Sequence, residues 1–326
     1  MPEVRYSAAI NRALSDAMEA DPLVVLFGED VAAPGGPFAV TRGLLAKFGP
    51  ARVRDTPISE AAIAGAAVGA ALGGLKPVVE IMFMDFVTLA MDAIVNQAAK
   101  AHFMFGGQCN VPMVLRMPHG GGLNAGPQHS QCLEAWFAHV PGLKVVAASN
   151  PADAYGLLRA AIDDPDPVVF VEHKALYTSK GDLPEPPPRA QIGEARIARS
   201  GRDATVAAYG SCVGLALEAA ATLAAEGIEL EVIDLRSIQP WDQAAVLASV
   251  RRTRRLVVAH EAVTAFGVGA EIAAHVSEHA FGDLAAPVLR VGADSMPVPF
   301  ARTLERECLP QQSDIVAAVR RSLTFA

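Results

Sequence analysis

The sequence predicts two doubly wound α/β domains, each with a parallel sheet covered by helices on both faces. Short apolar runs typical of buried strands alternate along the chain with longer helical segments. The chain has 326 residues, 52% of them hydrophobic, which is enough for one large domain or two of ordinary size. A proline-rich stretch at residues 181–190 (GDLPEPPPRA) can continue neither a helix nor a strand, so it divides the alternation in two.

The first half of the chain supplies the elements of the first domain. Ser7 and Ser59 can cap the first two helices, and Asp21-Pro22 ends the first one. Helices are predicted at residues 7–20, 60–73, 85–103 and 152–162. Strands are predicted at residues 23–27, 77–82, 111–116, 143–147 and 167–171. Because the strands are apolar along their whole length, we expect a parallel sheet buried on both faces.

The same alternation resumes after the proline-rich stretch. Strands are predicted at residues 204–208, 229–234, 255–260 and 288–291. Helices are predicted at residues 212–226, 243–252, 267–279 and 313–323. The predicted organisation is therefore a first domain over residues 1–180, a linker over 181–192 and a second domain over 193–326.

Composition excludes several classes of protein. The formal net charge of -8 argues against nucleic acid and anionic membranes as partners. Four cysteines without a CxxC pair indicate reduced thiols in a cytoplasmic protein. The N-terminus lacks the pattern of a signal peptide. The most apolar run, residues 61–75, is shorter than the ~20 residues of a spanning helix, so we expect a soluble protein.

Glu60 opens the second predicted helix, behind Ser59. A carboxylate at a helix start is ordinary, because the helix dipole favours it. The helix that follows is apolar all round, however, and such a helix is buried, so its carboxylate needs a partner. Gly65, Gly69 and Gly73 share one face of this helix, which indicates close approach of another helix, of another subunit for example, or merely reflects the alanine- and glycine-rich composition.

Two further segments have residue types suited to a ligand site. Phe83, Phe86 and neighbouring methionines lie where a strand passes into a helix and can stack on a flat ring, although ordinary core packing explains them equally well. A glycine-rich loop at residues 118–126 leads to His129 beyond the end of a strand, where doubly wound sheets bind ligands. His129 can act there as acid, base or donor, or belong to a mobile surface loop.

Several motifs, in order along nearly the whole chain, resemble the beta subunit of thiamin-diphosphate-dependent 2-oxo acid dehydrogenases. This family includes the pyruvate, branched-chain and acetoin enzymes, and residues 104–107 and 171–177 look most similar to the acetoin and pyruvate types. The motifs are GEDV (28–31), DTPISE (55–60), AVGAALGGLKPVVE (67–80), NQAAK (96–100), QHSQ (128–131), PGLKVV (141–146) and EVIDLRSIQPWD (231–242). The resemblance implies an N-terminal pyrimidine-binding domain and a C-terminal domain like that of transketolase.

The resemblance also implies roles for individual residues. Glu60 would hydrogen-bond the aminopyrimidine ring of thiamin diphosphate and promote the tautomer that deprotonates the thiazolium carbon. Phe86 would lie against the pyrimidine, with Met82 and Glu29 nearby, and His129 would stand near the thiazolium. Such a glutamate works best as a buried acid with a raised pKa. A structural potassium ion would be held, mainly through backbone oxygens, by Met113, Ala161, Ile162, Asp164 and Asp166.

The GDG motif that holds magnesium and diphosphate in thiamin enzymes is incomplete in this chain, at both Gly181-Asp182-Leu183 and Gly282-Asp283-Leu284. The resemblance therefore implies an alpha subunit that carries magnesium, in a heterotetramer of two alpha and two beta chains. The assembled enzyme would reductively acylate a lipoyl group on an acyltransferase core, which the second domain would contact.

Other functions remain open from the sequence. A transketolase-like half enzyme would share the glutamate but transfer ketol groups. A non-catalytic assembly subunit would share the fold, although the presence of Glu60, Phe86 and His129 counts against it. A nicotinamide-dependent dehydrogenase is a weaker alternative, because no dinucleotide fingerprint follows the first strand.

Overall fold

The computed structural model describes residues 3–325, so residues 1–2 and 326 of the predicted domains lie outside the described residues. The chain divides into two compact units. The first unit runs from the start of the described chain to His119 and includes Trp136–Ile192; the second comprises Gly120–Ala135 and the chain from Gly193 onward. Residues 120–135, which we expected in the first domain, thus belong to the second unit. None of the described helices is both long and apolar enough to cross a membrane.

The first unit contains the predicted parallel sheet. Its strands are arranged in the order β6-β7-β5-β4-β2-β3, and every neighbouring pair is parallel. The strands are β2 (Val24–Gly28), β3 (Val53–Asp55), β4 (Lys76–Glu80), β5 (Val114–His119), β6 (Lys144–Ala147) and β7 (Val168–His173). The sequence did not predict the short β3, nor β1 (Glu3–Arg5) and β8 (Lys180–Asp182), which form an antiparallel pair.

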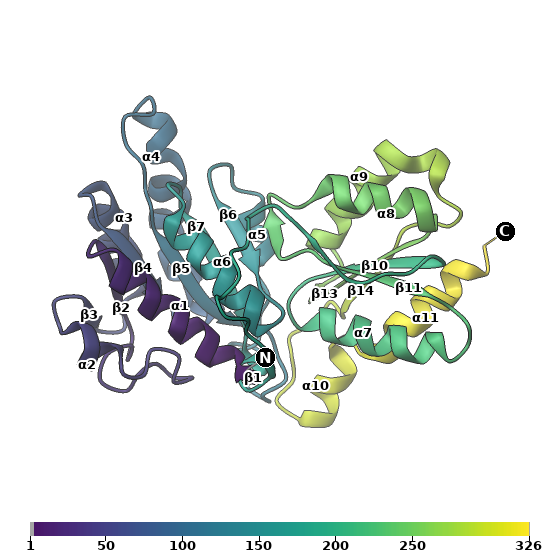
Figure 1. Cartoon of the computed structure of the whole chain (residues 1–326), viewed down its shortest axis with the longest axis horizontal. Helices are drawn as coiled ribbons and strands as arrows, with labels where there is room; N and C mark the ends of the chain where they lie inside the picture. Colours follow the sequence, from purple (N-terminus) through teal and green to yellow (C-terminus); the bar gives the residue numbers. More distant parts are fainter. Residues whose placement is uncertain (1–2, 326) are drawn as a thin grey trace. The chain divides into compact units, whose positions relative to one another are not determined.

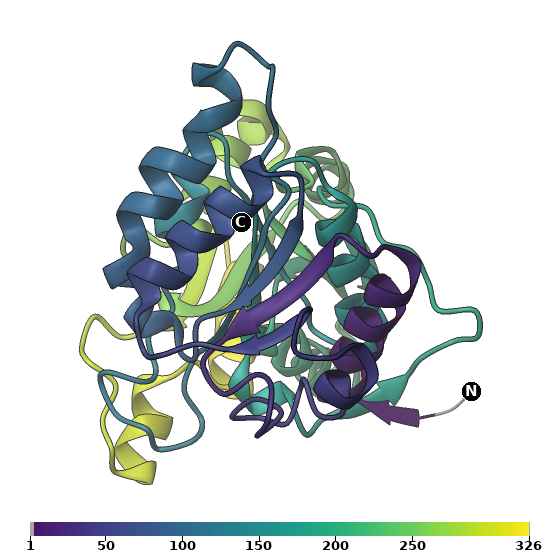
Figure 2. The ribbon, with the colours of Figure 1, turned by 90° about the vertical axis from the view of Figure 1, so that its left-hand side faces the viewer.

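Helices cover both faces of this sheet (Figures 1 and 2). On one face, α1 (Tyr6–Ala20) lies beside α6 (Pro151–Asp163), and both contribute to a core with the apolar side chains of β2 and β7. On the other face lie α3 (Glu60–Leu72) and the helical run after β4. Short helices α2 (Leu44–Phe48) and α5 (Glu134–Ala138) complete the set; α5 begins in the second unit and ends in the first.

Three helical predictions need correction. α1 begins at Tyr6, before Ser7, so Ser7 is not its cap. Ser59 precedes α3 as predicted, but its side chain forms no capping hydrogen bond. The predicted single helix over residues 85–103 consists of three kinds of turn in succession: the 3₁₀ helix η1 (Met84–Ala90), the π-helix η2 (Asp92–Ala98) and α4 (Ala99–Met104). π-Helical turns occur frequently at functional sites.

The proline-rich stretch is part of the first unit and not a free linker. Its first residues form β8, and Leu183 is buried in the core of this unit. Arg12 of α1 forms a bidentate ion pair with Glu185. At Gly156 of α6 an added Cβ would lie 3.0 Å from the carbonyl oxygen of Pro188, so the stretch lies tightly against this helix.

The second unit is a second doubly wound domain, as predicted. Its sheet has the order β14-β13-β10-β11-β9 and is parallel except for β9. The strands are β9 (Arg196–Arg199), β10 (Ala204–Ala208), β11 (Leu230–Asp234), β13 (Leu256–Val263) and β14 (Leu289–Ala293). Helices α7 (Ser211–Ala224) and α11 (Gln312–Leu323) cover one face, and α8 (Gln243–Thr253) and α9 (Val268–Ala280) the other (Figure 1). The remaining elements of this unit are β12 (Ser237–Gln239), α10 (Arg302–Cys308) and the 3₁₀ turn η4 (Phe281–Asp283), whereas the 3₁₀ turn η3 (Lys174–Leu176) belongs to the first unit.

Candidate cofactor site

Two carboxyl groups lie buried near the carboxyl ends of the first unit's strands, the edge where such sheets bind ligands. Glu29 follows β2 directly, and Glu60 is the first residue of α3; they are 4% and 5% exposed. Gly28 lies opposite Glu80 in the parallel pairing of β2 and β4. A Cβ at Gly28 would lie 2.5 Å from the Glu80 carbonyl oxygen, so glycine is needed for these strands to approach each other here.

The carboxyl group of Glu29 is strongly perturbed by its surroundings. Burial raises the pKa of Glu29 from 4.5 to about 7, and the negative charges of Glu60, Asp30 and Glu80 add to the effect. Its Oε1 atom is buried and has no hydrogen-bond partner among residues 3–325. At neutral pH Glu29 therefore exists in both protonation states, and it can donate a hydrogen bond to a ligand or accept one.

An arginine and two glutamates form a fully buried network beneath this site. Arg116 of β5, which is 0% exposed, donates from Nε and Nη2 to the two carboxylate oxygens of Glu172 over 2.7 and 2.8 Å. Its Nη1 atom donates to Glu80 over 2.6 Å, and the Tyr177 hydroxyl donates to Glu172 over 2.7 Å. Burial raises the pKa of Glu80, while the guanidinium opposes that shift. The network fixes the end of β4 next to Glu29, and it was not predicted from the sequence.

Aromatic side chains extend from this network to the surface of the site. Phe86 of η1 is half-buried and contacts Phe83 edge to face, with ring centroids 6.1 Å apart. Phe83 contacts Phe38 at 6.1 Å, and Phe38 stacks on Tyr177 at 4.7 Å. Met82 is also half-buried. The half-buried Phe86 and Met82 thus offer an apolar surface suited to a flat ring.

His129 belongs to the second unit, whereas Glu29, Glu60, Met82 and Phe86 belong to the first. Its loop is held by two carboxylates: Glu261 accepts from the Gly121 amide at 2.6 Å, and Glu305 accepts from the Gly122 amide at 3.0 Å. At Gly126 an added Cβ would lie 2.2 Å from the ring of Phe300. The structure therefore does not favour the mobile-loop alternative, because these contacts hold the loop in place. The imidazole of His129 is half-buried.

The two aspartates among the predicted potassium ligands already form ion pairs with a lysine of this chain. The side chain of Lys144 donates to both carboxylate oxygens of Asp164, at 2.6 and 2.8 Å, and to Asp166 at 3.1 Å. The Met113 carbonyl accepts a hydrogen bond from the Val168 amide at 2.9 Å. One lysine is thus paired with both carboxylates. The other predicted ligands, Ala161 and Ile162, are buried in the last turn of α6, where carbonyl oxygens have no intrahelical partner.

The residues of the first unit fit one end of thiamin diphosphate. Glu60 is a buried acid, Glu29 is a second acid with an unused oxygen, and Phe86 is a half-buried aromatic ring. Together these groups suit a flat, hydrogen-bonding aminopyrimidine. The same site does not favour a diphosphate, because the carboxyl groups of Glu29, Glu60 and Glu80 lie near one another and the guanidinium of Arg116 is already engaged by Glu80 and Glu172. This geometry agrees with the incomplete magnesium motif in the sequence.

Comparison with known proteins defines the class of this chain. Residues 2–180 match the family model described as "Transketolase, pyrimidine binding domain", and residues 193–315 match "Transketolase, C-terminal domain". A solved structure described as "Split gene transketolase, inactive beta4 tetramer" has a TM-score of 0.83 at 25% identity, and the match covers 99% of both chains. These matches confirm the predicted fold class.

Curated relatives narrow the class further. The chain is 49% identical over 324 residues to "Pyruvate dehydrogenase E1 component subunit beta-2, mitochondrial" of Oryza sativa subsp. japonica, covering 98% of this chain and 86% of the relative. It is 47% identical to "Acetoin:2,6-dichlorophenolindophenol oxidoreductase subunit beta" of Cupriavidus necator, covering 97% and 96%. The Bacillus subtilis protein of the same description is 46% identical, covering 96% and 95%. The chain belongs to the family of thiamin-dependent 2-oxo acid dehydrogenase beta subunits and is a subunit of an oxidoreductase.

Proposed function

We propose that this chain, with an alpha subunit, forms a pyruvate- or acetoin-type dehydrogenase that transfers an acyl group reductively to a lipoyl group of an acyltransferase. The substrate is first decarboxylated or cleaved, and the remaining two-carbon fragment is oxidised to the acyl level. The lipoyl disulfide accepts the two electrons of that oxidation, so that one sulfur is acylated and the other is protonated. The proposal is supported by relatives of both names at 46–49% identity over nearly the whole chain. The observation that carries it is the buried, electrostatically interacting pair of Glu29 and Glu60, together with the half-buried Phe86 on η1, which packs against α3.

Glu60 is proposed to activate the cofactor through a hydrogen bond. Its buried carboxyl group would hydrogen-bond a ring nitrogen of the aminopyrimidine, and Glu29 would offer its free oxygen to the same ring. Phe86 and Met82 would exclude water from the ring faces. When bound, thiamin diphosphate supplies the nucleophilic carbon that attacks the substrate carbonyl. His129 is proposed to move a proton near the reacting atoms, as a half-buried imidazole can.

An alpha subunit is proposed to bind magnesium and the diphosphate, because the acidic site of this chain disfavours the diphosphate. The surface of the first unit fits such a partner. Gly65 and Gly69 of α3 lie on its exposed side, and an added Cβ there would meet no atom within 4 Å. The predicted close helix contact is therefore not formed by this chain itself. Large apolar side chains in the same unit are also exposed: Ile58 (79%), Leu89 (65%), Phe103 (87%) and Met104 (69%).

We further propose a heterotetramer of two alpha and two beta chains, in which the second unit contacts the acyltransferase core. The split transketolase is described as an inactive tetramer of four beta chains, so a chain of this fold can enter a four-chain assembly. A potassium ion remains a proposal as well. Because the carboxylates of Asp164 and Asp166 are both engaged by Lys144, the ion would be held mainly by backbone oxygens, with Ala161 and Ile162 at the end of α6 the best candidates.

The test is calorimetric titration of thiamin diphosphate with magnesium into this chain, alone and mixed with its alpha subunit. We expect no binding to the lone chain and tight binding to the mixture. The loaded complex is then assayed with pyruvate or acetoin for acylated dihydrolipoamide, and with ketose donors for ketol transfer. Tight binding by the lone chain would refute the shared-site proposal. Ketol transfer without lipoyl acylation would establish the transketolase-like alternative.

A further inference from the structure

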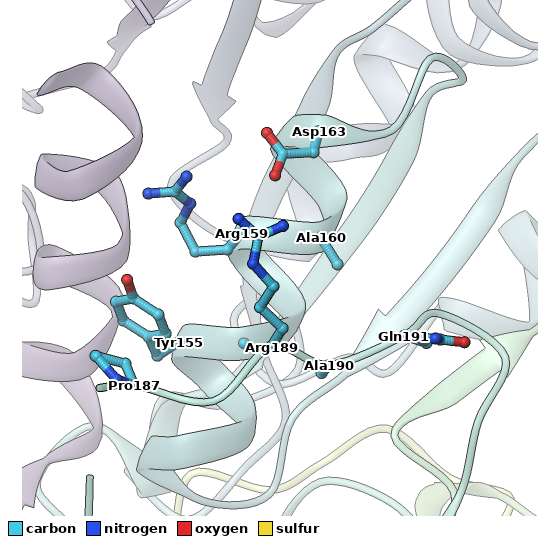
Figure 3. A pocket seen from close by; sticks show the side chains of 9 residues that line it. Tyr155, Arg159, Ala160, Asp163, Pro187, Arg189, Ala190 and Gln191 are labelled. Carbon is cyan, nitrogen blue, oxygen red and sulfur yellow. The ribbon is translucent and has the colours of Figure 1, made fainter. Parts of the chain in front are cut away.

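A cleft in the first unit lies away from the carboxyl pair and has no part in the proposed reaction. It has a volume of about 450 Å³, within the range of small-molecule sites, and lies between α6 and the proline-rich stretch (Figure 3). Its wall is well fixed, because Gly156 lies against the backbone of Pro188 and Glu185 is paired with Arg12. The lining residues are Tyr155, Gly156, Arg159, Ala160, Asp163, Pro187, Arg189, Ala190 and Gln191.

Two arginines of this cleft, the partly buried Arg159 and the exposed Arg189, have no acceptor within the described part of the chain. Neither Arg159 nor Arg189 forms a hydrogen bond or ion pair with any residue in the described range 3–325, and the Nε atom of Arg159 is buried. Figure 3 shows Arg189 extending alongside α6 to the level of Arg159, with the carboxylate of Asp163 beyond them. A buried guanidinium N–H without an acceptor is costly, so this cleft is suited to a ligand that supplies one.

The surrounding charges favour an anion. The cleft is lined by two guanidinium groups and one carboxylate, that of Asp163. The other acidic group nearby, Asp16 of α1, already accepts a hydrogen bond from the Tyr155 hydroxyl at 2.8 Å. Guanidinium groups bind phosphate oxygens in a bidentate manner and more strongly than they bind neutral acceptors.

The rest of the lining is apolar and suits an organic group attached to that anion. Ala160, Pro187 and Ala190 offer only aliphatic atoms, and the ring of Tyr155 lines the same cleft. We propose that this cleft binds a small organic phosphate, with the phosphate between Arg159 and Arg189 and the organic group over Ala160 and Ala190. The site is independent of the thiamin site.

The test is calorimetric titration of adenosine monophosphate, inorganic phosphate and adenosine into the full chain, without thiamin diphosphate. We expect saturable binding of adenosine monophosphate, weaker binding of phosphate and none of adenosine. Arg159→Gln and Arg189→Gln should each weaken adenosine monophosphate binding about tenfold or more. Arg5→Gln, at an exposed arginine without an ion pair among the described residues, should bind like the wild type.

A second variant covers the case that loss of an arginine unfolds the chain. Ala160→Phe fills the cleft but keeps both charges, so it should abolish binding of adenosine monophosphate while circular dichroism and the melting temperature report an intact fold. The proposal is overturned if the wild type binds neither phosphate compound at millimolar concentration. It is equally overturned if the arginine variants bind as tightly as Arg5→Gln, or if phosphate and adenosine monophosphate bind with equal affinity.

Discussion

Replacing Glu29 with glutamine tests the electrostatics of the carboxyl pair without a cofactor or a partner. Glutamine has nearly the same shape as glutamate but cannot ionise. The pKa of Glu29 is raised from 4.5 to about 7, chiefly by burial, so ionising this group in the folded chain costs roughly 3 kcal/mol. The variant lacks this cost.

The sign of the pH dependence follows from proton binding. Below pH 4.5 Glu29 is protonated in both the folded and the unfolded chain, so its titration contributes nothing. Between pH 4.5 and about 7 the folded chain binds the proton more tightly, so the free energy of unfolding of the wild type falls as the pH rises. Above about pH 7 the full penalty is present. The stability of Glu29→Gln relative to wild type should therefore increase by about 2 to 3 kcal/mol from pH 5 to pH 8.

The measurement is urea unfolding of wild type and variant at several pH values, followed by circular dichroism. Glu278→Gln, at an exposed glutamate on α9, is the matched control and should show a difference that is independent of pH. A constant difference between Glu29→Gln and wild type from pH 5 to pH 8 would refute the reasoning. It would mean that the carboxyl group is solvated in the folded chain.

Three further substitutions test other parts of the structure. Glu60→Gln should slow deuterium exchange at the thiazolium carbon of the assembled enzyme roughly 100-fold or more, measured by NMR, whereas exchange at the wild-type rate would remove Glu60 from its proposed role. Arg116→Met leaves two buried carboxylates without their guanidinium and should cost about 3 to 5 kcal/mol in urea unfolding; a loss below about 1 kcal/mol would contradict the ion-pair network. Gly69→Leu should leave the melting temperature of the lone chain unchanged or higher but prevent co-elution with the alpha subunit, and undisturbed co-elution would exclude this face of α3 from the contact.

Alternation of apolar runs and helical segments was enough to predict the two sheets and most of the helices. The observed helix boundaries differ from the predicted ones by a few residues. The first residue of a helix depends on backbone geometry, which a lone serine does not determine. The predicted helix over residues 85–103 is helical throughout, but the sequence pattern shows neither its change from 3₁₀ to π turns nor its packing against α3.

The site was predicted in part. Burial of Glu60 was expected from the apolar helix behind it, and the structure confirms that Glu60 is buried. The expectation that the whole helix is buried was wrong for the lone chain, because one side of α3, including Gly65 and Gly69, is exposed. The role of Arg116 was missed, although a charged residue at the end of the otherwise apolar predicted strand 111–116 was a usable signal. Its partner Glu172 lies 56 positions away, so only the parallel pairing of β5 with its neighbours brings the three side chains together. The carboxylates that hold the His129 loop could not be predicted from the sequence either, since Glu305 is 183 positions from Gly122.

Residues 120–135 belong to the second unit although the chain returns to the first unit after them, and this affects how the protein can be divided into fragments. The chain passes between its two units three times, after His119, Ala135 and Ile192, and not once as a simple tandem arrangement would. A fragment ending at residue 192 would retain the glycine-rich loop but lose Glu261 and Glu305, which hold it. A fragment beginning at residue 193 would lose Glu134, the partner of the Tyr209 hydroxyl at 2.7 Å. Neither half is therefore a natural module, and a gene cut at the apparent domain border would separate a histidine from the residues that position its loop.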